Sequence, residues 1–89
     1  RVSAQGYRIQ IYTGGNSRND KIEAQQMRVK CQQHFPELAA YVHFISPHWV
    51  CRVGDFKTRE EAARYVTRLR KARVSYEVRV VSSPILAIR

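Results

Sequence analysis

The chain has few cysteines and no long apolar run, and these shortages exclude several classes of function. Its two cysteines, Cys31 and Cys51, form no C-x-x-C pair, so neither a zinc site nor a thioredoxin-type centre is predicted. No run of about 20 apolar residues occurs, and residues 1–6 lack the apolar core of a signal peptide. We therefore expect no metal, no cofactor and no membrane insertion.

The short chain also limits the kind of site it can build. Its 89 residues suffice for one compact domain with a single core. Most apolar side chains must fill that core, so a binding site must be a surface or a shallow groove. No pair of carboxylates facing a cleft is visible, as a hydrolase would need. The sequence predicts a binding module and not an enzyme.

Acidic residues are scarce as well. Lys and Arg number 16 against seven Asp and Glu, which gives a formal charge of +9. Such a charge attracts an acidic partner, and nucleic acid, anionic lipid and a carboxylate-bearing polysaccharide all fit that description. Composition does not separate these partners, so the choice depends on the sequence pattern.

Two halves of the chain repeat one pattern of strand, glycine turn, capped helix and second strand. Tyr7, Ile9 and Ile11 alternate with polar residues, as the third predicted strand also does. The predicted elements are a strand at Tyr7–Thr13, a helix at about Asn19–His34, strands at Ala40–Ser46 and Trp49–Val53, a helix after the capping box Thr58–Glu61, and a strand at Tyr76–Val81. The domain is expected to span residues 7–81, with an N-terminal tail at 1–6 and a C-terminal tail at 82–89.

This βαββαβ order predicts an α+β fold of the ferredoxin-like or RNP-like type. Right-handed crossovers interleave the two halves into a four-stranded antiparallel sheet with the first and third strands in the centre. Both helices then cover one face, and the other face stays open. Successive side chains of a strand point to opposite faces of the sheet. This alternation places five side chains on the centre of the open face: Arg8, Gln10, Tyr12, Val50 and Arg52.

The flanking strands add a second set to the open face. The second strand would present Tyr41, His43 and Ile45, and the fourth strand Glu77 and Arg79. A shift of one residue in the pairing of any strand would move all of its side chains to the opposite face of the sheet.

The central set suits a carbohydrate. Sugar rings pack their C–H faces on aromatic rings, and their hydroxyls need paired donors and acceptors, which Tyr12, Gln10 and Arg52 supply. If the glycan carries free carboxylates, Arg8 and Arg52 can form charge-assisted hydrogen bonds with them.

Several other residues are interpreted structurally. Cys31 and Cys51 face inward as small buried side chains, and a disulfide between them is an alternative in an oxidising compartment. Asp55 lies near the predicted helix start, where an acidic residue is stabilising. Ile22 and Val29 lie opposite the core stripe of the first helix, so they are simply exposed or form a contact with a protein partner.

Three segments resemble the SPOR domain, a module of bacterial division and wall-remodelling proteins, over about Gly6 to Val81. They are Ile9-Gln10-Ile11, the third strand Trp49 to Phe56, and the capped helix start Lys57 to Ala62. Two positions depart from the family pattern: Val50 replaces a frequent arginine, and Tyr12-Thr13 replaces a glycine and a small residue.

The resemblance implies the βαββαβ fold and binding of peptidoglycan glycan strands stripped of stem peptides. It also implies recruitment of a host protein to the division septum, and therefore a place in the bacterial cell envelope, in the periplasm or anchored there. Carried over by position, Gln10 and Arg52 become the leading glycan contacts.

An RNA-recognition motif is the alternative, because it shares the order of elements and a basic sheet face. An RNA-binding version needs two outward aromatic residues on the third strand, where this chain has Val50 and Arg52. Nucleic acid is therefore disfavoured as the partner.

Overall fold

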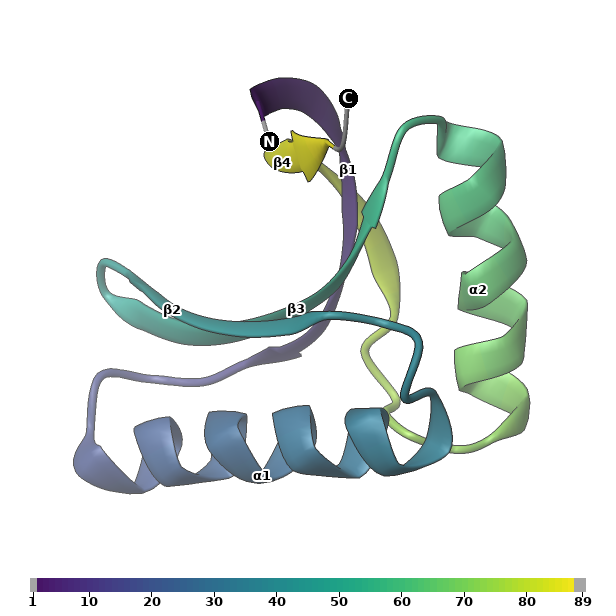
Figure 1. Ribbon diagram of the computed structural model, residues 1–89. Helices are drawn as coiled ribbons and strands as arrows, with labels where there is room; N and C mark the ends of the chain where they lie inside the picture. The colour runs from purple at the N-terminus through teal and green to yellow at the C-terminus, as the bar shows by residue number, and fades with distance from the viewer. Residues whose placement is uncertain (1, 88–89) are drawn as a thin grey trace.

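The computed structural model describes residues 2–87 and contains six elements in the predicted order (Figure 1). The elements are β1 (Val2–Thr13), α1 (Arg18–His34), β2 (Ala40–Ile45), β3 (His48–Phe56), α2 (Arg59–Lys71) and β4 (Arg79–Ala87). The predicted α+β fold with βαββαβ order is confirmed. No helix within these residues is long and apolar enough to cross a bilayer.

The four strands form one antiparallel sheet in the order β2-β3-β1-β4, so β1 and β3 are central as predicted. The sheet is strongly bent. Figure 1 shows α1 beneath the β2 and β3 arm and α2 beside the upright arm, so both helices lie on the convex side. The opposite surface carries no helix within the described chain, and we call it the concave face.

Side-chain caps explain where both helices begin. The Ser17 hydroxyl accepts a hydrogen bond from the Asp20 N–H at 3.2 Å, and the Asp20 carboxylate accepts one from the Ser17 N–H at 3.1 Å. The Thr58 hydroxyl accepts from the Glu61 N–H at 3.2 Å. These bonds satisfy amide groups that a first helical turn leaves without partners.

The core fills the space between the convex side and the helices. Ile9 and Ile11 from β1 and Val53 from β3 are almost fully buried there, which confirms the predicted parity at these positions. Cys31 and Cys51 are free, buried thiols in the same cluster. Burial raises the pKa of Cys31 to about 11 and that of Cys51 to about 12, so both remain protonated at neutral pH.

The two segments expected as tails belong to the sheet, which corrects the prediction. β1 and β4 pair continuously from Val2 opposite Ala87 to Gln10 opposite Arg79. The segment Ser82-Ser83-Pro84 was predicted to end the strand. However, β4 is an edge strand, and a proline is tolerated there because one side of the strand has no neighbouring strand to pair with. The rest of the expected tails, residues 1 and 88–89, lies outside the described residues.

Candidate functional site

A row of four side chains crosses the concave face at the middle of the sheet. Tyr41 on β2 pairs with Arg52 on β3, Arg52 with Gln10 on β1, and Gln10 with Arg79 on β4. Directly paired residues in antiparallel strands point to the same face. The predicted site residues Gln10 and Arg52 are therefore brought together, with Tyr41 and Arg79 beside them.

Gln10 is the centre of a hydrogen-bonded network. Its carbonyl oxygen accepts from the Arg52 Nε at 2.9 Å, and its amide nitrogen donates to the Thr13 hydroxyl at 2.6 Å and to the Glu77 carboxylate at 3.3 Å. Only 3% of the residue is exposed. Gln10 thus lies on the predicted face, but its amide is already occupied by neighbouring side chains.

Tyr12 lies on the convex side, which corrects its place in the predicted site. Gln10 pairs with Arg52 but Tyr12 pairs with Cys51, so β1 holds one extra residue in a bulge between them. The Tyr12 ring packs against the core, and its hydroxyl donates to the Glu23 carboxylate on α1 at 2.7 Å. Burial and this carboxylate raise the pKa of Tyr12 above its ordinary value.

Thr13 takes the place that parity assigned to Tyr12. It pairs with Val50, and its hydroxyl donates to the Glu77 carboxylate at 2.5 Å. The same Glu77 oxygen lies 3.7 Å from the Arg79 Nε. The predicted pair Glu77 and Arg79 therefore joins the concave face, while sequence reasoning missed Thr13 because the bulge leaves no clear mark in the sequence.

Arg8 is on the concave face as predicted, but its charge is compensated within the chain. Its Nε and Nη2 donate to one oxygen of Asp55 at 3.2 and 2.9 Å, and its guanidinium lies 4.2 Å from the centre of the Tyr41 ring. The Tyr41 hydroxyl donates to the other Asp55 oxygen at 2.5 Å. Arg8 therefore supports Tyr41 and offers little charge to a ligand.

Asp55 is a concave-face residue that the sequence interpretation assigned to the helix start. Tyr7 pairs with Phe56 and Ile9 with Val53, so β3 holds an extra residue in a second bulge. Gly54 adopts a φ of +80° there, a conformation that glycine readily adopts. An isolated glycine in a strand pattern was the signal that could have revealed it.

Val50 lies where β3 pairs with His43 on β2 and Thr13 on β1. It was predicted as a site residue, but only 3% of it is exposed, because a short apolar side chain is covered by its longer neighbours. Val50 forms part of the floor of the face and has almost no surface for direct contact.

Arg52 has the least compensated charge on this face. Its Nε binds the Gln10 carbonyl oxygen, and no carboxylate forms an ion pair with it within residues 2–87. Burial, followed by the positive charges of Arg8 and Arg79, lowers its pKa from the ordinary value, although an arginine stays charged at neutral pH. A partly buried cation repelled by two others attracts an anionic ligand.

His43 completes the face beside Arg52. Its ring stacks on Tyr41 with centroids 6.0 Å apart and planes 14° from parallel. Burial first, and then the charges of Arg8 and Arg52, lower the pKa of His43. His43 and Tyr41 thus place two nearly parallel rings next to the guanidinium groups.

The site contains no metal-binding arrangement in the part of the chain that the structure describes, since no three His, Cys, Asp or Glu side chains gather there. The family model of the SPOR domain matches residues 3–79 of the chain. The chain belongs to the SPOR domain family. No curated protein and no solved structure gave a match.

SPOR domains are peptidoglycan-binding modules of bacterial envelope proteins, so membership supports cell-wall binding in general. The family is a binding family and not a catalytic one. In this SPOR domain the bent sheet and its bulges decide which side chains remain accessible on the concave face.

Proposed function

We propose that the concave face binds peptidoglycan glycan strands that lack stem peptides, and thereby recruits a host protein to the cell wall or division septum. The observation that carries this proposal is the Arg52 guanidinium, held in place by Gln10 and without a carboxylate partner among residues 2–87. Trimming of stem peptides leaves free lactyl carboxylates on the glycan, and Arg52 can pair with one of them.

The rest of the face suits a sugar chain. Tyr41 and His43 supply two nearly parallel aromatic rings beside Arg52, which can contact the C–H groups of a sugar. Arg79 is exposed at the other end of the row, and Thr13 and Glu77 offer polar groups between them. An extended glycan lying across the strands from Tyr41 to Arg79 would meet aromatic, cationic and hydroxyl groups in turn.

Gln10 acts in this proposal mainly as a positioning residue. Its amide links Arg52 on β3 to Thr13 on β1 and to Glu77 in the loop before β4, so it holds side chains from three parts of the chain in one geometry. Pre-organised side chains lose less conformational freedom on binding, which favours affinity. This assigns Gln10 a different role from the direct contact that its position in the sequence suggests.

RNA binding fits the face less well. The central strands present Arg8, Gln10, Val50 and Arg52 to the concave side, and none of these is aromatic. RNA-recognition modules stack bases on aromatic residues of their central strands. The basic charge alone would produce a nonspecific, salt-sensitive affinity for RNA.

Co-sedimentation with purified sacculi tests the proposal. We expect stronger retention after an amidase has removed the stem peptides, and about tenfold weaker retention for Arg52→Ala, because a charge-assisted hydrogen bond is lost. Arg64→Ala on the exposed side of α2 removes the same charge far from the face and serves as the matched control.

Equal loss of retention in the Arg52 and Arg64 variants would show that only net charge matters and would contradict the proposal. Retention that falls after amidase treatment would contradict the preference for strands without peptides. A steep fall of RNA affinity with salt, together with no binding to sacculi, would support the RNA alternative.

A further inference from the structure

Strand β2 is an edge of the sheet, and among the described strands it pairs with β3 alone. The Gly54 N–H donates to the Ala39 carbonyl oxygen at 2.7 Å, so these two residues form a hydrogen-bonded pair. In an antiparallel ladder, hydrogen-bonded pairs alternate with pairs whose backbone groups point outward. By that alternation the backbone groups of Tyr41 and His43 face β3, while those of Val42 and Phe44 point away from the sheet. No hydrogen bond to these outward groups of Val42 and Phe44 is found within residues 2–87, so the outer edge of β2 presents a row of unpaired donors and acceptors.

The two edges of the sheet differ in protection. β4 carries Pro84 and Arg79, and both residue types discourage pairing of an edge with another strand. β2 has the sequence AYVHFI, without proline, lysine or arginine. Phe44 and Ile45 near its end are 49% and 43% exposed. The β2 edge thus has the properties of a strand that accepts a partner.

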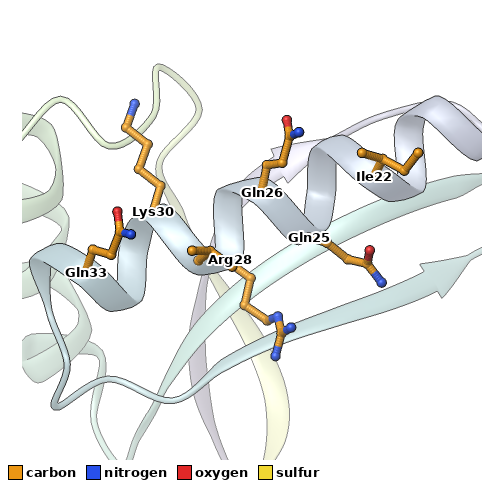
Figure 2. Close-up of a pocket in the computed structure, with 7 residues that line it drawn as sticks. Ile22, Gln25, Gln26, Arg28, Lys30 and Gln33 are labelled. Atoms are coloured by element: carbon orange, nitrogen blue, oxygen red, sulfur yellow. The ribbon is translucent and has the colours of Figure 1, made fainter.

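A basic flank of α1 runs beside this edge. Lys21, Gln25 and Arg28 follow each other at spacings of four and three residues, so they lie on one side of the helix. The Lys21 Nζ lies 5.3 Å from the centre of the Trp49 ring, near the end of β2. Figure 2 shows Gln25 and Arg28 extending towards the strands, whereas Gln26 and Lys30 point away.

Gln25 and Arg28 also line a pocket of about 340 Å³ together with Ala40, Tyr41, Val42 and His43. Four consecutive strand residues line the pocket, so it runs along the β2 backbone. The Arg28 Nε is buried and has no hydrogen-bond partner, and neither Lys21 nor Arg28 forms an ion pair within the described chain. Arg28 as a whole is half-buried, so its guanidinium group can still reach an incoming carboxylate that would compensate its charge.

We propose that the β2 edge accepts an extended acidic segment of a partner protein as a fifth strand. Its backbone pairs with Val42 and Phe44, and its carboxylates at alternate positions face Lys21 and Arg28. Alternate side chains of a strand point to one side, so acidic residues two apart would all meet the basic flank of α1. The pocket shares Tyr41 and His43 with the concave face, but the pairing groups lie on the outer edge of β2 and the basic flank lies on α1, so the proposal does not depend on the proposed glycan binding.

The charge of the molecule favours this occupant over a second copy of the chain. The formal charge is +9, and a β2-to-β2 dimer would place two basic flanks close together. An acidic strand instead compensates the charges of Lys21 and Arg28. Ile22 and Val29, the predicted protein contact, lie farther around α1 at 43% and 46% exposure, and their contact remains a prediction.

A synthetic peptide of about seven residues that alternates glutamate with valine, with both ends blocked, is the probe. We expect it to protect the Val42 and Phe44 amides from hydrogen exchange and to bind in a salt-dependent way. Lys21→Gln and Arg28→Gln should each weaken binding by about two- to fivefold, as expected for partly exposed ion pairs. Both variants should keep normal binding to sacculi.

Two controls use the unchanged protein. The same peptide with alternate backbone amides methylated should not bind, because it cannot form the hydrogen bonds of a paired strand. A peptide with lysine in place of each glutamate should not bind either, because it carries no carboxylates for the basic flank. Equal binding of the methylated peptide, protection of β4 amides in place of β2 amides, or dimerisation of the chain through β2 would overturn the proposal.

Discussion

Accessibility on the concave face depends on the length of each side chain. Gln10 and Val50 are each only 3% exposed although no helix covers them, because longer neighbours on adjacent strands close over them. By contrast, the longer side chains remain partly exposed to solvent, namely Arg52, Tyr41 and His43. A ligand on the concave face therefore contacts mainly the long side chains, and the shorter side chains hold the long ones in place.

His43 gives this face a dependence on pH. Its pKa is lowered in the folded protein by burial and by Arg8 and Arg52, whereas in the unfolded chain it is near 6.5. The unfolded state takes up the proton first as the pH falls, so the free energy of unfolding should decrease below about pH 6.5 until the folded pKa is passed. Urea unfolding between about pH 7 and pH 5 should show a shallower decrease for His43→Gln.

The titration of the His43 ring by NMR provides the direct check. A midpoint at or above that of an unfolded peptide would contradict the lowered pKa. An unchanged pH dependence of stability in the glutamine variant would show that other groups carry the effect.

Two bulges decide which residues the central strands present. The extra residue in β1 turns Tyr12 towards α1 and brings Thr13 to the concave face. The extra residue in β3, at Gly54, brings Asp55 to the same face as its partner Arg8. Each bulge reverses the parity beyond it, so a strict alternation fails at the strand ends while it holds in the middle.

Tyr12→Phe and Thr13→Val test this reversal as a pair. Tyr12→Phe removes a hydrogen bond to α1 and should lower the free energy of unfolding by about 1 kcal/mol, with binding to sacculi unchanged. Thr13→Val keeps the side-chain shape but removes the hydroxyl that links Gln10 to Glu77. We expect about two- to fivefold weaker binding to sacculi, because the network no longer holds Gln10 and Glu77 in place.

Chemical denaturation and co-sedimentation on the same samples separate the two effects. The opposite result, with Tyr12→Phe weakening binding at normal stability and Thr13→Val neutral, would return Tyr12 to the site.

The folded domain extends beyond the boundaries predicted from the sequence. The paired ends of β1 and β4 lengthen the sheet beyond the predicted boundaries at residues 7 and 81. Ile85 is 2% exposed, and a side chain at Gly6 would approach its Cδ1 to 2.5 Å. Close packing between the two strands explains why a glycine stands at that position and indicates that the extension belongs to the folded unit.

Ile85→Ala should therefore lower the free energy of unfolding by about 2–4 kcal/mol, as expected when a buried aliphatic side chain is truncated. Tyr76→Ala is the control, because Tyr76 is fully exposed in the loop before β4 and its removal should change stability by less than about 0.5 kcal/mol. Denaturant unfolding measures both. A loss for Ile85→Ala as small as that of the control would mean that residues 82–87 are a tail after all.

The sequence alone was sufficient for the order of the elements, the class of fold and the placement of Gln10 and Arg52 on the same face of the sheet. Those features follow from local periodicity and from caps, which act over a few residues and leave a direct pattern in the chain. Only the tertiary structure decided the positions of Tyr12, Thr13 and Asp55, the burial of Gln10 and Val50, and the extension of β1 and β4 beyond the predicted boundaries. These depend on pairing between strands and on contacts across the bent sheet, which residues far apart in the chain determine together.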